Sequence, residues 1–284
     1  MSHDGMTRRG FLKAGAAGAA LTMAGCATKK SDLPLSEDGL PLIDLHVHSD
    51  NSTIDAITAL SLQQGIIYGM VEHAGTKENV YPRVLSNDEE LLAWTASLEG
   101  KGVYKGVQAE WTDWSSCFSK KALATLDYVL TDTMTFPGPG GKRMKLWEKE
   151  AVIEDRADYF MDAYVDWHLQ ILDGQPIDVL ANVSWLPAKH AESYAMLWTP
   201  RRIKTVVEAF ITRNIAMEIS SSFKLPKTHF LRIANEGGVK FCFGSNGRYP
   251  NMGKLDYSLQ MARELGLKHG DMWVPSKNGA RAGK

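Results

Sequence analysis

Short β-rich runs alternate with helical segments along most of this 284-residue chain. The predicted strands cover residues 42–48, 66–73, 103–111, 127–134, 177–185, 215–222 and 239–247. The segments with helical periodicity include residues 55–65, 87–100, 155–174, 199–214 and 255–266. Strict alternation predicts parallel βαβ units whose sheet is covered by helices. About seven such units favour an α/β fold of the distorted (β/α)7, TIM-like barrel type over an open sheet.

The first thirty residues have the pattern of an export signal. An arginine pair, Arg8 and Arg9, is followed by a Phe-Leu-Lys triplet and then by a run of Ala and Gly too short to span a bilayer. This pattern predicts a twin-arginine signal in residues 1–30 and a barrel domain in residues 31–284. The six residues that end at Cys26 resemble a bacterial lipobox. We therefore expect an exported protein, either periplasmic or a lipoprotein anchored through Cys26.

Composition and charge narrow the classes of function. Hydrophobic residues make up 44% of the chain and charged residues 23%, as in an ordinary globular protein with ample apolar side chains for a core. The formal net charge of -1 gives no general attraction to nucleic acid or to an anionic membrane surface. We therefore expect a small-molecule substrate as the partner, and no nucleic acid.

Two histidines stand one residue apart at the end of the first predicted strand. Residues i and i+2 of a strand point to the same face, so Asp44, His46 and His48 are expected on one side. Leu45 and Val47 are expected to pack together on the other side. Two imidazoles side by side at a strand end suit a metal ion.

Polar residues also stand at the C-terminal ends of the other predicted strands. They are His73, Glu110, Asp132, Asn182, Glu218, and Asn246 followed by Arg248. The carboxyl ends of barrel strands meet at one face, where barrel enzymes carry their active sites. Taken singly, His73 can be a satisfied core histidine, Asn182 a turn residue and Glu218 the partner of a lysine. A polar residue at the end of every strand indicates a site.

These motifs, in their order, resemble those of the polymerase and histidinol phosphatase (PHP) family of metal-dependent hydrolases. The matching segments lie within residues 40–270 and read DLHVHS, VEHAG, GVQAEW, LDYVLTDTM, IDVLAN, AMEIS and FGSNGR. The resemblance implies a distorted seven-stranded barrel that binds up to three metal ions and hydrolyses phosphoesters. It also implies metal-ligand roles for His46, His48, His73 and Glu110.

Four positions depart from the family pattern. Met134 and Asn182 stand where the family carries histidines, and Asn246 and Arg248 replace the Asp and His of its last motif. We therefore expect one divalent ion per chain, Zn, Mn or Fe, with coordination positions left open for water and substrate. The expected ligands are His46, His48, His73, Glu110 and Asn246.

The remaining candidates for the chemistry are carboxylates and cations near the strand ends. Asp132 is expected to be an extra ligand or a general base, and Glu218 is a second candidate base. Arg248, with Lys145 or a neighbouring cation of the Gly-rich segment 135–152, is expected to hold an anionic substrate group.

Three tryptophans near the strand ends, Trp111, Trp114 and Trp185, either form flat walls that suit sugar rings or pack at the barrel rim. Together the candidates predict an exported metal-dependent hydrolase of a small polar substrate, a phosphoester or a sugar derivative, acting through a metal-activated water. The alternatives are a metal-dependent sugar lyase or isomerase, and a non-catalytic ligand-binding protein on a degenerate barrel.

Overall fold

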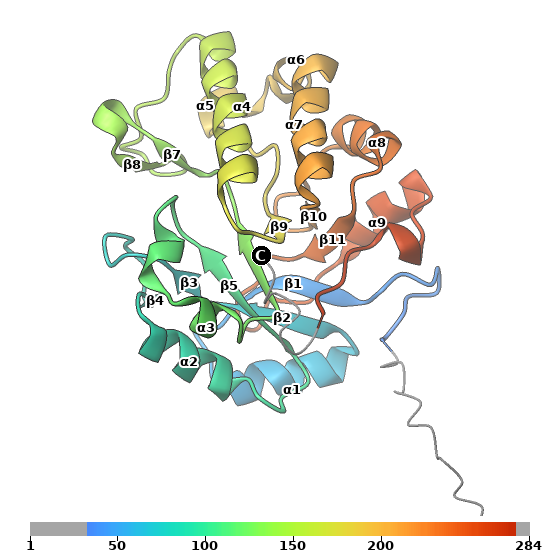
Figure 1. Cartoon of the computed structure of the whole chain (residues 1–284). Helices are drawn as coiled ribbons and strands as arrows, with labels where there is room; N and C mark the ends of the chain where they lie inside the picture. The colour runs from blue at the N-terminus through green and yellow to red at the C-terminus, as the bar shows by residue number, and fades with distance from the viewer. Residues whose placement is uncertain (1–32, 277–284) are drawn as a thin grey trace, which may run out of the picture. The chain divides into compact units, whose positions relative to one another are not determined.

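The computed structural model describes residues 33–276, so the predicted export signal and Cys26 lie outside the described part of the chain. Seven parallel strands form a nearly closed barrel (Figure 1). In barrel order they are β1 (Ile43–His48), β2 (Ile67–Val71), β5 (Tyr104–Ala109), β6 (Tyr128–Thr131), β9 (Val179–Leu180), β10 (Ala216–Ser220) and β11 (Phe241–Gly244). Each lies inside one of the predicted runs. The predicted fold class is therefore confirmed.

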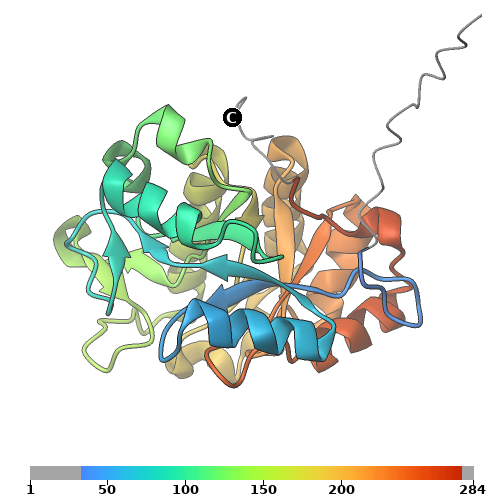
Figure 2. The same ribbon diagram turned by 90° about the horizontal axis from the view of Figure 1, so that it is seen from below.

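Helices cover the outside of this barrel (Figure 1 and Figure 2). They are α1 (Ile54–Gln64), α2 (Asp88–Ser97), α3 (Lys120–Leu123), α4 (Ala157–Gly174), α5 (Ala188–Ala191), α6 (Tyr194–Leu197), α7 (Pro200–Arg213), α8 (Thr228–Gly237) and α9 (Asp256–Leu265). Side chains of Thr53, Asn87 and Thr199 cap α1, α2 and α7 by accepting a backbone N–H of the first turn. Within residues 33–276, none of the helices combines the length and the apolar character needed to cross a lipid bilayer.

Two short pairs of strands follow the ends of barrel strands β2 and β6. After β2, β3 (His73–Ala74) pairs with β4 (Val84–Leu85) and with β5. After β6, β7 (Thr135–Pro137) and β8 (Arg143–Lys145) form an antiparallel hairpin within the Gly-rich segment 135–152. The chain reverses there through its Pro-Gly-Pro-Gly-Gly turn, because glycine tolerates the backbone angles that such a turn needs. Three 3-10 helices are found among residues 33–276: η1 (Trp114–Cys117), η2 (Pro139–Gly141) within this turn, and η3 (His269–Asp271).

The strict alternation predicted for the first strand fails in its middle. The register of β1 against β2 shifts between Asp44 and Val47, which marks a β-bulge or a similar irregularity. Leu45 consequently packs in a small apolar cluster with Tyr128, whereas Val47 packs in the larger cluster that includes the helices. One extra residue in a strand reverses the faces of the residues that follow it. The prediction that Leu45 and Val47 share a face was therefore wrong.

The smaller apolar cluster takes residues from all seven barrel strands, so it fills the inside of the barrel. Tyr128 is completely buried, and its hydroxyl donates to the backbone oxygen of Leu45 at 2.7 Å. Gly106 on the neighbouring strand makes room for this ring, since a Cβ atom there would lie 2.4 Å from Cζ of Tyr128. A barrel filled by side chains in this way has no pore through it. A ligand can therefore bind only at an end of the barrel, and barrel enzymes bind their ligands at the C-terminal ends of the strands.

The last strand is joined to the first through the loop after β11. His48 N donates to Gly247 O, and Gly247 N donates to His46 O, each at 2.9 Å. The Asp44 carboxylate accepts hydrogen bonds from Ser245 N at 2.8 Å and from Ser245 Oγ at 2.5 Å. These bonds hold the histidine-bearing end of β1 against the loop that follows β11.

Candidate metal centre and active-site cavity

A cavity of about 360 Å³ opens at the C-terminal ends of the barrel strands. Its lining residues are His48, His73, Tyr81, Gln108, Asp132, Met134, Trp147, Asn182, Trp185, Phe223, Asn246 and Arg248. The structure thus brings together strand-end residues that are separated by up to two hundred positions in the sequence. A larger hollow of about 650 Å³ lies between α4 and α7. Its Arg202 is already paired with Asp158 and Asp162, so we place the chemistry in the smaller cavity.

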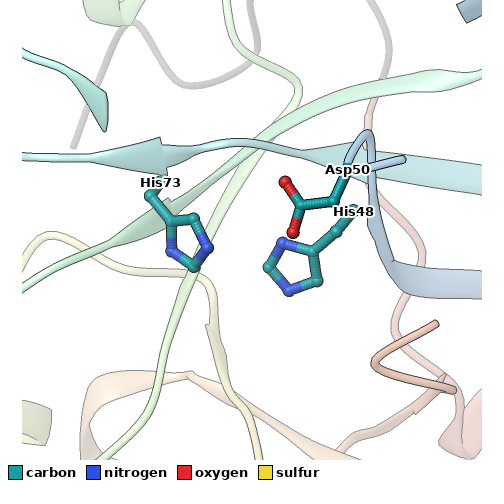
Figure 3. Close-up of side chains that lie close together, drawn as sticks. All are labelled: His48, Asp50 and His73. Carbon is teal, nitrogen blue, oxygen red and sulfur yellow. The ribbon is translucent and has the colours of Figure 1, made fainter. Parts of the chain in front are cut away.

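Three donor side chains meet beside this cavity (Figure 3). His48, Asp50 and His73 each offer a ligand atom, and these atoms lie within 4.8 Å of one another. Nδ1 of His48 and Nε2 of His73 are buried and have no hydrogen-bond partner among the described residues. A buried polar atom is costly to leave unpaired, and two imidazoles with a carboxylate are a ligand set known for Zn and Fe(II). The donor set therefore fits one divalent ion.

The electrostatic surroundings of His48 also suit a metal ligand. Burial lowers the pKa of His48 well below its ordinary value, and the charges of His46, His73 and Arg248 lower it further. A low pKa keeps the imidazole neutral at physiological pH. Only the neutral ring has a lone pair to give to a metal.

His73 is held in a fixed orientation by two neighbours. Its Nδ1 lies 2.7 Å from Oε1 of Glu110, whose Oε2 accepts a hydrogen bond from the Tyr81 hydroxyl at 3.1 Å. The Tyr81 ring stacks on the His73 ring, with 3.7 Å between centroids and an interplanar angle of 10°. A proton on Nδ1 leaves the Nε2 lone pair free for a metal. In this structure Glu110, a predicted ligand, orients His73, and each of its two oxygens has a hydrogen-bond partner.

Replacing Tyr81 with phenylalanine is expected to weaken metal binding by roughly tenfold, the lower end of the effect of removing a direct partner of a metal ligand, because the hydroxyl acts on His73 only through Glu110. The variant keeps the stacked ring and removes only the hydroxyl that restrains Glu110. Competition with a chromophoric chelator measures the affinity, and Tyr159→Phe, at an exposed site outside the cavity, is the control. Unchanged affinity in both Tyr81→Phe and Glu110→Gln would show that neither residue positions His73.

His46 faces acceptor oxygens on both sides. Its Nδ1 lies 2.8 Å from Oε1 of Glu218, and its Nε2 lies 3.2 Å from Oε1 of Gln108. The other oxygen of Glu218 accepts a hydrogen bond from Asn182 N at 2.8 Å. Gly244 leaves room for this carboxylate, because a Cβ atom there would overlap Oε1 of Glu218. His46 and Glu218 are thus placed as a buried pair beneath the cavity, and neither ring nitrogen of His46 is left without a partner.

The pKa of His46 reflects this pairing. Burial acts to lower the pKa, but the nearby carboxylates, first Glu218 and then Asp132 and Asp44, outweigh it and raise the pKa above its ordinary value. A protonated ring donates from both nitrogens, as the two acceptor oxygens require.

Asp132 is a half-buried carboxylate that lines the cavity. Its Oδ1 accepts from Met134 N at 2.9 Å and its Oδ2 from Asn182 Nδ2 at 3.3 Å. Burial, and then the negative charge of Glu110, raise the pKa of Asp132 to about 6. A carboxylate with such a pKa can exchange a proton near neutral pH.

Arg248 is fixed at the mouth of the site. Its Nε donates to Oδ2 of Asp50 at 3.0 Å, and its Nη1 contacts both oxygens of Asn246 at 3.3 Å. Its Nη2 has no hydrogen-bond partner within residues 33–276 and is available to an anion. Lys145 lies farther out: its Nζ sits 4.2 Å from the centre of the Tyr81 ring and donates to Val80 O, and it does not line the cavity.

Several residues of this site were not predicted from the sequence. Asp50 lies in the polar turn two residues beyond His48, and the same spacing of two residues separates His46 from His48. Gln108 stands two residues before Glu110 in its predicted strand, so the period of two could have indicated it. The other three are the aromatic residues Tyr81, Trp147 and Phe223, which lie in loops where no periodic pattern marks them.

The three predicted tryptophans have different positions. Trp185 lines the cavity, as one of the two interpretations proposed. Trp114 is completely buried in the core, and Trp111 packs against Trp167 with 5.2 Å between ring centroids. Packing against other side chains, in the core for Trp114, therefore accounts for Trp111 and Trp114.

No family model matches the sequence, and no curated protein matches it either. Among solved structures, the chain is similar to the histidinol phosphate phosphatase of Lactococcus lactis subsp. lactis Il1403 in complex with zinc, L-histidinol and phosphate. The TM-score is 0.57 at 15% sequence identity, and the match covers 84% of this chain and 97% of the phosphatase. An archaeal ribonuclease P with mature tRNA is less similar, with a TM-score of 0.40 and 12% identity over 80% of this chain and 83% of the other. The chain therefore has a PHP-like barrel fold, as its motifs predicted.

Proposed function

We propose that this chain is a metal-dependent hydrolase of small phosphoesters. The observation that carries the proposal is the pair of buried, unpartnered nitrogens, His48 Nδ1 and His73 Nε2, grouped with the Asp50 carboxylate. Histidines with a purely structural role would have their ring nitrogens hydrogen-bonded. A phosphatase of similar fold, solved with zinc and phosphate, supports the choice of a divalent metal and of a phosphoester.

The residues of the cavity have separable roles in this reaction. A divalent ion held by His48, Asp50 and His73 would supply Lewis acidity, which lowers the pKa of water and polarises a phosphoryl oxygen. Arg248 holds the anionic group of the substrate through its free Nη2 by a charge-assisted hydrogen bond. Asp132, mostly deprotonated above pH 6, accepts the proton of the attacking water.

The geometry favours one ion per chain. Met134 and Asn182 offer no imidazole, and His46 and Glu110 are engaged with other side chains. The guanidinium of Arg248, held against Asp50, also adds positive charge that repels a second cation. Zn, Mn and Fe are all compatible with the donor set.

Elemental analysis of the purified chain is expected to find about one divalent ion per molecule, because the donor set offers three ligands for a single ion. Hydrolysis of small phosphoesters should stop when a chelator removes the ion and return when Zn, Mn or Fe is restored. Three ions per chain would contradict the ligand assignment. Tight binding of a small molecule without turnover would favour the ligand-binding alternative, and an eliminated or isomerised product would favour the lyase or isomerase.

We further propose that the hydrolase acts outside the cytoplasm, on the support of the sequence pattern in residues 1–30. Changing Arg8 and Arg9 to lysine is expected to leave unprocessed protein in the cytoplasm, because lysine lacks the planar guanidinium. Changing Cys26 to serine should release the protein from membranes. Fractionation followed by immunoblotting measures both effects, and normal processing of the double-lysine variant would remove the twin-arginine assignment.

A further inference from the structure

Three large aromatic side chains from loops line the cavity, and we call them the aromatic collar: Trp147, Trp185 and Phe223. Trp147 follows the hairpin after β6, Trp185 follows β9 and Phe223 follows β10, and these three strands are adjacent in the barrel. The collar residues therefore belong to one wall, beside the ends of β6, β9 and β10.

The collar is unusually open to solvent for its composition. Trp147 is 44% exposed and Phe223 is 37% exposed, and Trp185 is half-buried. Aromatic surface gathered at a cavity, instead of being scattered singly over the molecule, marks a place where a ligand covers it.

The bottom of the same cavity is polar and only partly satisfied. Gln108 accepts from His46 through Oε1, and its amide nitrogen donates no hydrogen bond within the described part of the chain. Each oxygen of Asp132 accepts one hydrogen bond and has capacity for another. The cavity thus offers a donor and an acceptor below an aromatic wall.

Size and charge limit what fits there. A volume of about 360 Å³ lies near the lower end of the roughly 300–1,000 Å³ usual for ligand cavities, which suits one small molecule and excludes a polymer inside the cavity. Arg248 is the one cationic side chain among the lining residues, and its free Nη2 serves a single anionic group.

We propose that the substrate is a phosphate monoester of a monosaccharide, with its sugar ring against the aromatic collar. This inference deepens the proposed function and rests on it for the phosphoester. A pyranose ring presents an apolar C–H face to aromatic rings and hydroxyl groups at its edge to Gln108 and Asp132. An open-chain alcohol has no such face, and a purely aromatic alcohol leaves the polar groups below it unpaired, which is unfavourable.

The test measures binding to the metal-loaded full chain by calorimetry. The probes are phosphonate analogues of hexose phosphates, glycerol phosphate and phenyl phosphate, whose C–P bond resists hydrolysis. The tightest hexose analogue is expected to bind about tenfold better than the other two, in line with the energy of a single aromatic contact. Trp147→Ala and Trp185→Ala should remove most of this preference and leave the affinity for the glycerol analogue unchanged. Trp147→Phe should keep part of it.

The control variant is Tyr159→Ala, which removes an exposed aromatic ring outside the cavity and should change nothing. Equal affinity for the three classes of probe, tightest binding of the phenyl analogue, no binding of any hexose analogue, or full preference in the alanine variants would each overturn the inference. Ring-selective binding without hydrolysis of any hexose phosphate would uphold the collar as a binding site for the sugar ring of a phosphorylated monosaccharide and reject the hydrolase. Hydrolysis of phosphoesters without any preference for a sugar ring would uphold the hydrolase and reject the monosaccharide phosphate as its substrate.

Discussion

Replacing His48 with alanine is expected to release the divalent ion and to lower the rate of phosphoester hydrolysis by roughly 10³-fold or more, because a bound ion supplies several kcal/mol of transition-state stabilisation. Nδ1 of His48 is buried without a hydrogen-bond partner among residues 33–276, and its low pKa keeps the ring neutral. Without it, His73 and Asp50 are left as a two-ligand set, which we expect to lose the metal at micromolar concentrations. Elemental analysis and phosphatase assays of the same preparation measure the two effects.

The matched control for this variant is His229→Ala. His229 is a half-buried histidine whose Nε2 lies 3.3 Å from Trp198 O, and it does not line the cavity. The His229→Ala variant should lose neither metal nor activity, and thermal unfolding of both variants shows whether each is folded. A full complement of metal in folded His48→Ala would exclude the His48, Asp50 and His73 site.

The fold could be predicted from the sequence because the signals for it are local. Alternation of β-rich and helical segments specifies βαβ units, and such units close into a barrel when their number is near seven or eight. The strand ends were less predictable, since the hydrogen-bond partners that end a strand come from distant residues. The bulge in β1 is an example. No sequence signal between Asp44 and Val47 indicates the extra residue, because the bulge depends on how β1 pairs with β2.

The site could be predicted only in part, for a related physical reason. Residue type and spacing indicate that His48 and His73 can bind a metal, and the structure brings them together. Whether an individual carboxylate is a ligand or the partner of a ligand depends on distances between elements. Glu110 lies against His73, and Glu218 lies against His46. Neither arrangement is readable from the chain, because the contacting residues are 37 and 172 positions apart.

The two carboxylates proposed as general bases differ in their access to the substrate. Asp132 lines the cavity and has a pKa near 6, raised by burial and by the charge of Glu110. Glu218 is 1% exposed, does not line the cavity, and has one oxygen bonded to His46 and the other to Asn182 N. The geometry therefore favours Asp132 as the group that takes the proton and Glu218 as a positioning residue.

Replacing Asp132 with asparagine is expected to lower the hydrolysis rate by about 10²- to 10⁴-fold with the metal still bound, because the amide keeps the shape and cannot accept the proton. A base must be deprotonated to act, so the wild-type rate should fall as the pH decreases through about 6, and this dependence should vanish in Asp132→Asn. Glu218→Gln, in contrast, should retain it. Rate–pH profiles of the wild type and the two variants, with metal analysis at each pH, distinguish a lost general base from a lost metal ligand. Loss of the ion from Asp132→Asn would instead make Asp132 a ligand, and persistence of the pH dependence in that variant would assign the proton transfer to another residue.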